Sequence, residues 1–345
     1  MRAAGGAAAA ALLLARGAQA QVARKEIRIG GRRAKVIDVH AHCIFPELKQ
    51  RVPNANPLGP NLPSLILGSQ RIDAMDARGI DVQALSVNTY WWYSADRDTA
   101  RQIVAVHDEG LAKWCDAHRD RFVALSSVAL QFPDLAAEQL EHAVKNLGAR
   151  GASIGGHVDG EPPSAPKYDP FWRKAEELNV PVFMHPNNAL NIAREGALEG
   201  SGGLGNIVGN PLETTVFLSH MIFEGTLDRF PKLKVCAAHG GGYLPSYLGR
   251  TEVACDVRDD ARCANKRKPH EYLQDQVVVD SMVFSSEGLR HLVAETGVSQ
   301  VVYGSDIPYN WPDTIDLIAQ APFLSDADKI AILGGNLMKL LRIDS

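Results

Sequence analysis

The chain has 345 residues and a formal net charge of -4; hydrophobic residues make up 46% of it and charged residues 22%. This length fits one large domain or two small ones, and the apolar share is enough to bury a substantial core. No long basic run is present, which argues against nucleic acid as a partner. No segment after residue 20 approaches the ~20 unbroken apolar residues that a membrane span needs, so we expect no membrane insertion.

The N-terminus is biased in composition. Residues 1–21 read MRAAGGAAAAALLLARGAQAQ, in which one arginine precedes an apolar Ala/Leu stretch and Ala18-Gln19-Ala20 forms a small-x-small sequence. This pattern is typical of export signals, so we expect a leader at 1–20 and a single folded domain at 30–345. The alternative is an Ala-rich extension on a cytoplasmic protein, because the apolar stretch is short and Arg16 lies just past it.

Eight short runs after the leader have the composition of β-strands. Most of them are apolar at consecutive positions, as expected for strands that are covered on both faces. The predicted strands span residues 34–39, 82–87, 122–128, 151–155, 182–185, 234–238, 277–280 and 301–303.

Segments with apolar residues at helical spacing lie between these strands. Ser325 has the residue type that favours an N-cap, and it stands where the last of these segments begins. The predicted helices span residues 71–78, 97–118, 135–147, 170–178, 213–229, 244–255, 287–296 and 325–341.

The alternation of strand and helix indicates the fold class. Eight strand–helix pairs predict a (β/α)8 TIM barrel of the α/β class. A doubly wound sheet is the alternative, but no Gly-rich dinucleotide loop follows the first strand. Residues 45–69, with five prolines, would form a long loop at the barrel end where active sites are built.

The five cysteines are Cys43, Cys115, Cys236, Cys255 and Cys263, and no Cys-x-x-Cys pair is present, so a zinc knuckle is not expected. Cys255 and Cys263 flank a polar stretch, VRDDAR. They would pair in an oxidising compartment and stay free in the cytoplasm. We expect free thiols.

Ligand-type residues stand where several of the predicted strands end. His40 and His42 end the first strand in VIDVHAHC, His185 follows in VPVFMHP, and Asp306 lies in VVYGSDIP. A His-x-His pair on a strand places both imidazoles on one face. The carboxyl ends of parallel barrel strands converge on one mouth. A single histidine at a strand end is usually a core residue, but the combined pattern predicts a site for zinc or a similar divalent ion.

Further residues near the predicted mouth are candidates for lining it. Tyr90, Trp91 and Trp92 follow the second strand and would form a flat wall for a planar substrate, or else pack under the loop. His157, in SIGGHVDG, follows the fourth strand and would line the pocket. His239 ends the sixth strand in VCAAHGGG.

Several motifs together resemble a known family: DVHAH, RIDAMDARGIDVQALS, NPLETT, FPKLKVCAAHGGGYLP, VVYGSDIP and ILGGNLMKLL. Over roughly residues 36–343 the chain is similar to the amidohydrolase superfamily (amidohydrolase 2), in particular to its branch of aminocarboxymuconate-semialdehyde decarboxylase-like enzymes. The resemblance implies a barrel with one divalent metal, commonly zinc with manganese as the alternative. It assigns His40, His42, His185 and Asp306 as the ligands.

The same resemblance implies roles for two further residues. His239 matches the catalytic histidine that acts on the substrate or on metal-bound water. Arg250, in YLPSYLGR, matches an arginine that reaches the neighbouring subunit's site and pairs with a substrate carboxylate, which implies a homodimer or a higher homo-oligomer.

The implied activity is non-oxidative decarboxylation of an aromatic or conjugated unsaturated carboxylate. The alternative is hydrolysis of an ester, lactone or amide by metal-bound hydroxide, for which the same ligands serve. The chain departs from the branch pattern in two places: NPLGPNLPSLILGSQ lacks an expected arginine, and HPNNALN lacks an expected aromatic residue. The resemblance therefore predicts the type of reaction and leaves the substrate open.

Overall fold

The computed structural model describes residues 23–53, 63–87 and 91–344. The expected leader at 1–20 and the candidate Tyr90 lie outside these residues. Within the described ranges, no helix is both long enough and apolar enough to cross a membrane.

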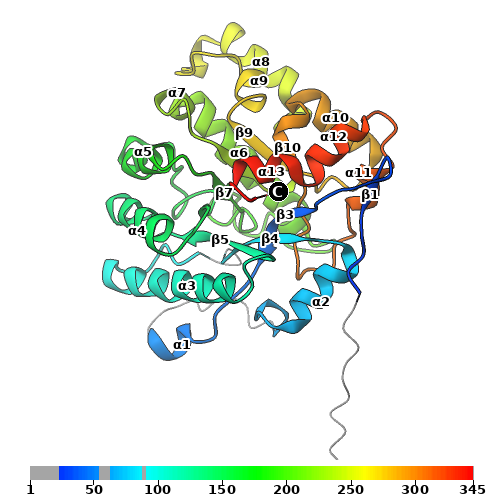
Figure 1. Cartoon of the computed structure of the whole chain (residues 1–345). Helices are drawn as coiled ribbons and strands as arrows, with labels where there is room; N and C mark the ends of the chain where they lie inside the picture. The colour runs from blue at the N-terminus through cyan, green and yellow to red at the C-terminus, as the bar shows by residue number, and fades with distance from the viewer. Residues whose placement is uncertain (1–22, 54–62, 88–90, 345) are drawn as a thin grey trace, which may run out of the picture.

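A closed ring of eight parallel strands forms the centre of the molecule, and helices surround it (Figure 1). Each strand pairs with the next one along the chain. The ring closes because His42 N donates to Ile307 O at 2.8 Å and Asp306 N donates to His40 O at 2.8 Å. The predicted (β/α)8 barrel is therefore confirmed. Its strands are β3 (Ile37–His42), β4 (Val82–Ser86), β5 (Phe122–Ser127), β6 (Gly151–Ile154), β7 (Val182–Met184), β8 (Val235–Ala237), β9 (Val277–Asp280) and β10 (Val301–Val302).

The first barrel strand begins three residues later than predicted. The apolar run at 34–39 suggested an end before His40, but β3 includes both histidines, and all six of its residues are buried. Polar side chains can occupy a buried strand where they find polar partners. The histidines therefore stand on a regular element, which fixes their positions more closely than a loop would.

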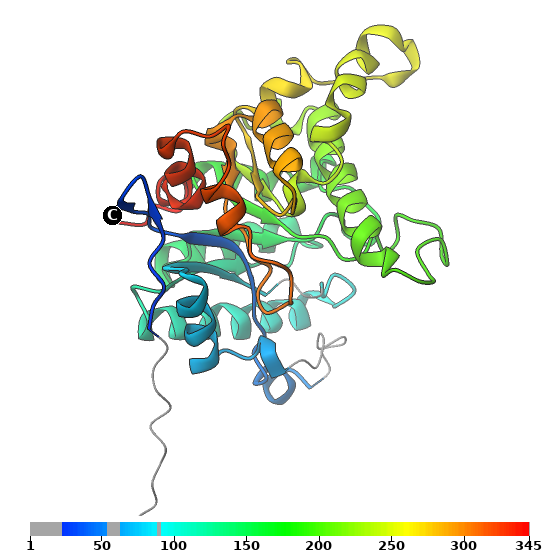
Figure 2. The same ribbon diagram turned by 90° about the vertical axis from the view of Figure 1, so that its right-hand side faces the viewer.

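A small hairpin that the sequence analysis did not predict precedes the barrel. Strands β1 (Arg28–Ile29) and β2 (Arg32–Arg33) pair antiparallel through Gly30 and Gly31, whose φ angles are 55° and 78°. Glycine adopts this left-handed conformation without steric strain, and Gly-Gly is a known hairpin signal. Figure 2 shows the hairpin beside the C-terminus, at one end of the barrel.

The principal helices cover the outside of the barrel, and their apolar faces pack on the strands. Asp96 caps the longest of those described here, because its carboxylate accepts the backbone N–H of Asp98 and Thr99. These helices are α2 (Ser69–Arg78), α3 (Arg97–Ala117), α4 (Pro133–Asn146), α5 (Asp169–Glu177), α6 (Asn210–Phe223) and α10 (Ser286–Thr296). Helix α8 (Leu248–Val257) packs on a neighbouring short helix instead, and Leu248 is its one buried residue. The shorter helices are α1 (Leu48–Arg51), α7 (Thr226–Arg229), α9 (Pro269–Leu273), α11 (Ile315–Ala319), α12 (Asp326–Ile330) and α13 (Asn336–Leu340).

Two predicted helices are interrupted in the structure. The segment 213–229 divides into α6 and α7 at Gly225, which has a φ of 70°. The segment 325–341 contains a π-helical turn, Ala331–Gly335, between α12 and α13. The N-cap prediction for Ser325 is confirmed, since its hydroxyl accepts the N–H of Asp328.

The expectation for Cys255 and Cys263 was wrong. The two residues form a disulfide with a Cα–Cα distance of 5.9 Å. The chain reverses after α8 through a short turn and Arg262, whose φ is 50°. This reversal returns Cys263 to Cys255, and a sequence spacing alone does not reveal it.

The barrel interior is filled with side chains and is not a channel. Ile37, Val39, Leu125 and Phe183 belong to one buried cluster inside the strands. The ring of Phe183 lies 5.4 Å from that of His40. The polar residues at the mouth therefore rest directly on this apolar interior.

Candidate metal centre

Four side chains meet at the carboxyl ends of three strands. His40 and His42 come from β3, His185 follows β7, and Asp306 follows β10. All four are buried, and their possible ligand atoms lie within 4.8 Å of one another. Asp306 Oδ1 is 2.6 Å from His42 Nε2 and 3.3 Å from His40 Nε2. The structure thus brings together the four residues that the sequence analysis selected.

His185 is the clearest sign that this cluster fits an ion. Both of its ring nitrogens are buried without a hydrogen-bond partner among the described residues. An unpaired buried polar group is costly and rare in native proteins. Burial, reinforced by the charges of His42 and His40, holds the pKa of His185 well below its usual range. A neutral imidazole with a free lone pair is what a divalent metal requires.

The neighbouring carboxylates have the opposite effect on His40. Burial alone would lower the pKa of His40, but Asp306 and Asp280 outweigh it and raise that pKa to about 10. Burial would also raise the pKa of Asp306, yet the histidines hold it well below its usual range. In the absence of an ion, a proton on His40 therefore compensates the carboxylates, so protons compete with a metal for this site.

Asp280, at the end of β9, orients two parts of the site. Its Oδ2 accepts His40 Nδ1 at 2.7 Å and the backbone N–H of His239 at 2.9 Å, and its Oδ1 accepts Gly240 N at 2.8 Å. The contact makes Nδ1 of His40 a donor and leaves Nε2 directed at the cluster. The sequence analysis missed this residue, although Asp280 ends a predicted strand and so carried the same signal as Asp306.

His239 lies beside the cluster without joining it. Its ring centroid is 5.1 Å from that of His40 and 5.4 Å from that of His185. Its backbone is left-handed, with a φ of 56°, which for a non-glycine residue needs external support. Asp280 provides that support through the backbone N–H. Burial and the nearby charge of His40 lower the pKa of His239 to about 4, so the ring is neutral at neutral pH.

A cavity of about 430 Å³ opens beside these residues. It is bounded mainly by the loops that follow β7 and β10, and amide side chains dominate its polar surface. The ring of Tyr309 lies 5.4 Å from that of His42. The residues that line the cavity are His42, His185, Pro186, Asn187, Asn188, Asn206, Asn210, Asp306, Tyr309, Asn310 and Trp311.

The other candidate residues lie elsewhere. Trp91 stacks on Tyr93 with ring centroids 5.6 Å apart, and Trp92 is fully buried in the core. His157 is mostly buried, and its Nδ1 accepts the N–H of Gly160. Arg250 is exposed on α8. Trp91, Trp92, His157 and Arg250 are not among the residues that line this cavity. Asn187, Asn188, Tyr309 and Asn310 were missed because their signal lies only in the loops HPNNALN and DIPYNW.

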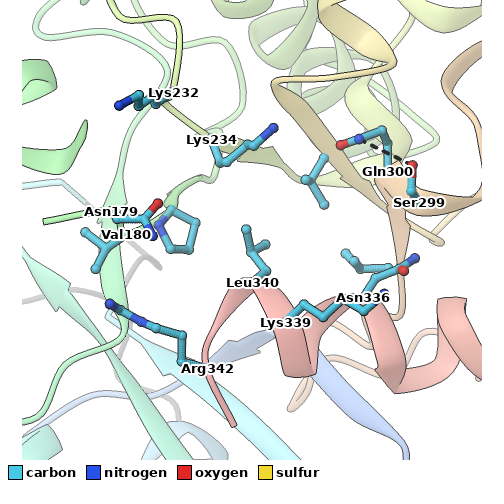
Figure 3. Close-up of a pocket in the computed structure, with 13 residues that line it drawn as sticks. Asn179, Val180, Lys232, Lys234, Ser299, Gln300, Asn336, Lys339, Leu340 and Arg342 are labelled. Atoms are coloured by element: carbon cyan, nitrogen blue, oxygen red, sulfur yellow. Dashed lines mark hydrogen bonds between the residues drawn. The ribbon is translucent and has the colours of Figure 1, made fainter. Parts of the chain in front are cut away.

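A second cavity, of about 310 Å³, lies where the strands begin (Figure 3). Lys232, Lys234, Lys339 and Arg342 line it, and it contains none of the four ligand-type residues. Barrel active sites form at the carboxyl ends of the strands, so the first cavity is the candidate substrate pocket.

Residues 37–343 match the family model for amidohydrolases. The chain belongs to the amidohydrolase family. The 2-amino-3-carboxymuconate-6-semialdehyde decarboxylase of Dictyostelium discoideum is 32% identical over 279 residues, which are 79% of this chain and 76% of that relative.

Solved structures agree with this assignment. A 2,6-dihydroxybenzoate decarboxylase from Rhizobium matches this amidohydrolase with a TM-score of 0.79 at 26% identity, over 90% of this chain and 100% of that one. A dihydroxybenzoic acid decarboxylase from Polaromonas sp. JS666, solved with manganese and 2-nitroresorcinol, has a TM-score of 0.77 at 23% identity, over 90% and 98% of the two chains. The relatives of this amidohydrolase thus include both aminocarboxymuconate-semialdehyde and dihydroxybenzoate decarboxylases.

Proposed function

We propose that this amidohydrolase is a metal-dependent, non-oxidative decarboxylase of an aromatic or conjugated unsaturated carboxylate. The observation that carries the proposal is the buried group of three histidines and one aspartate with His239 beside it. The relatives named above are decarboxylases, which supports this reaction over hydrolysis.

His40, His42, His185 and Asp306 would hold one divalent ion. Three imidazoles and a carboxylate suit zinc, which is our expectation, and the manganese in the Polaromonas relative supports the alternative. When bound, the ion would supply a Lewis acid that orients an oxygen of the substrate and stabilises developing negative charge.

The reaction requires that a residue of the chain deliver one proton to the substrate. Decarboxylation breaks the bond between the ring or diene carbon and the carboxylate, CO2 departs, and the electron pair left on carbon takes up a proton. His239 is the residue placed for this transfer, because its ring lies next to the ligand cluster and is neutral at neutral pH. It would accept a proton from solvent or substrate and deliver it to that carbon.

The resemblance assigns Arg250 to a neighbouring copy's site, and we extend that assignment to this chain. Its exposure on α8 leaves the guanidinium available to a second subunit. A planar bidentate donor is suited to a carboxylate. The proposed enzyme is therefore a homodimer or larger in which Arg250 binds substrate across the interface.

The test is product analysis with metal-loaded enzyme and a panel that includes 2,6-dihydroxybenzoate, hydroxylated benzoates and conjugated diene carboxylates. We expect release of CO2 together with a product that has lost its carboxyl group. An ester, lactone and amide panel is run in parallel, and products that gain water without loss of CO2 would overturn the proposal.

A further inference from the structure

The loop after His185 is held by a buried carboxylate that belongs to α6. Glu213, in the first turns of that helix, is 1% exposed. Its Oε2 accepts the backbone N–H of Asn187 at 2.8 Å and of Ala189 at 3.0 Å. Its Oε1 accepts the N–H of Gly156 at 3.1 Å, from the loop after β6. One carboxylate thus ties together the loops that follow two neighbouring barrel strands.

The start of α6 makes two more contacts with this loop. Asn210 Oδ1 accepts the N–H of Asn188 at 2.7 Å, between the two N–H groups that Glu213 accepts. A Cβ added to Gly209 would lie 2.6 Å from the carbonyl oxygen of Asn188, so the close approach requires glycine. Three consecutive backbone N–H groups are therefore all bound by the first turn of one helix.

The conformation of the loop needs such support. Asn188 and Ala189 have φ angles of 58° and 55°, in the left-handed region. Ala189 has no side-chain hydrogen bond with which to stabilise this conformation, and it is buried. Residues in this region persist only where their surroundings hold them. Successive N–H groups in such a turn form a concave site for an acceptor, and here the carboxyl oxygens of Glu213 fill it.

We propose that Glu213 is a positioning residue which, with Asn210, fixes the segment 186–189 so that the side chains of Asn187 and Asn188 face the substrate. Both asparagines line the cavity beside the ligand cluster. An amide both donates and accepts hydrogen bonds, so a hydroxyl substituent, which does the same, is the substrate feature that would use both groups. The identity of that feature depends on the proposed function, whereas the order of the loop does not.

A carboxylate is required at this position because the three hydrogen bonds that Glu213 accepts all come from backbone N–H groups, while His157 Nε2 lies 3.9 Å from its Oε1. The amide of a glutamine has one oxygen, so its NH2 group would face an N–H in either orientation. Asp108 offers a matched control elsewhere in the barrel. It is buried and accepts Ser127 N at 2.9 Å and the Ser126 hydroxyl at 2.6 Å. A hydroxyl can also accept, so Asp108→Asn retains both contacts.

The first measurement is hydrogen exchange on the full-length, metal-loaded protein, followed by mass spectrometry of a peptide that begins at or before residue 184 and contains the amides of Asn187, Asn188 and Ala189. In Glu213→Gln we expect these amides to exchange at least roughly tenfold faster than in the wild type. Asp108→Asn should leave the peptide unchanged, and Glu213→Asp should restore part of the protection. Wild-type exchange in Glu213→Gln would overturn the proposal, whether or not the protein proves to be a decarboxylase.

The second measurement is calorimetric binding of 2,6-dihydroxybenzoate and of benzoate, which lacks the hydroxyl groups. Glu213→Gln should weaken binding of the hydroxylated probe roughly tenfold, as the loss of a hydrogen bond predicts, and change the affinity for benzoate much less. Equal losses for both probes would refute the positioning role. If Glu213→Gln does not fold, Asn210→Ala removes the acceptor of Asn188 and carries the exchange expectation alone, with faster exchange confined to the loop, because Asn210 also lines the cavity.

Discussion

At the scale of single residues, the position of His239 gives the sharpest prediction for the reaction. Its ring is close to the ligand cluster but lies outside it. His239→Ala should therefore lower kcat by about 10²–10⁴-fold, the usual contribution of general acid–base catalysis. Steady-state kinetics with the substrate found in the panel would measure this.

Metal content provides the control for that variant. Because His239 is not one of the four clustered residues, His239→Ala should bind as much metal as the wild type. Full turnover in the variant would contradict the assigned role, and loss of the metal would place His239 among the ligands.

Asp280 allows a prediction about affinity for the ion. It accepts the side chain of His40 and the backbone N–H groups of His239 and Gly240, and all of these are donors. An asparagine cannot satisfy them, so Asp280→Asn should reduce metal affinity about 10–100-fold, as for other residues that orient a ligand. Competition with a chelator measures the affinity.

Asp108→Asn is again the suitable comparison, because its hydrogen bonds survive the change. Its metal affinity should equal that of the wild type. If Asp280→Asn bound metal as tightly as this control, orientation of His40 by Asp280 would not matter for the site.

At the scale of secondary-structure elements, the disulfide stabilises the end of α8. Cys255 lies in that helix and its partner is eight residues further along the chain. Replacement of both cysteines by serine should lower the free energy of unfolding by about 2 kcal/mol, since the closed loop is short. Urea unfolding with and without reductant measures this difference, and an equal midpoint in the two proteins would show that the bond adds no stability.

The sequence predicted the elements well where apolar periodicity was the deciding signal. All eight barrel strands and the four clustered residues followed from strand ends and barrel geometry. The interruption at Gly225 and the hairpin at Gly30-Gly31 depend on left-handed backbone angles, which periodicity does not encode. The cavity wall was harder to predict, because the backbone N–H groups of Asn187 and Asn188 are bound by residues of α6 that lie more than twenty positions further along the chain.

At the scale of the whole molecule, the cluster of His40, His42, His185 and Asp306 makes the free energy of unfolding depend on pH. The pKa of His40 is raised from 6.5 to about 10 without an ion. His40 therefore stabilises the metal-free fold fully below pH 6.5, and this contribution disappears as pH rises through about 10. A metal displaces the proton, so its affinity should increase with pH across the same interval, by up to about tenfold for each unit.

Thermal unfolding of the metal-loaded and metal-free proteins tests this linkage. The gap between their Tm values should widen as pH rises from 6.5. At a free metal concentration 100 times the dissociation constant, the stabilisation amounts to about 2.7 kcal/mol. A gap that stays constant with pH would exclude His40 as the group that exchanges its proton for the ion.

The carboxylate of Asp280 has one further consequence, for anyone who redesigns this enzyme. The same group accepts hydrogen bonds from the ring of His40 and from the backbone of His239, so the expected ligand and the proposed proton donor are held by one carboxylate. An ion that prefers longer bonds would shift the imidazole of His40. Asp280 would move with that ring and would change the position of His239. Metal exchange and tuning of the acid–base step are therefore not independent design variables in this barrel.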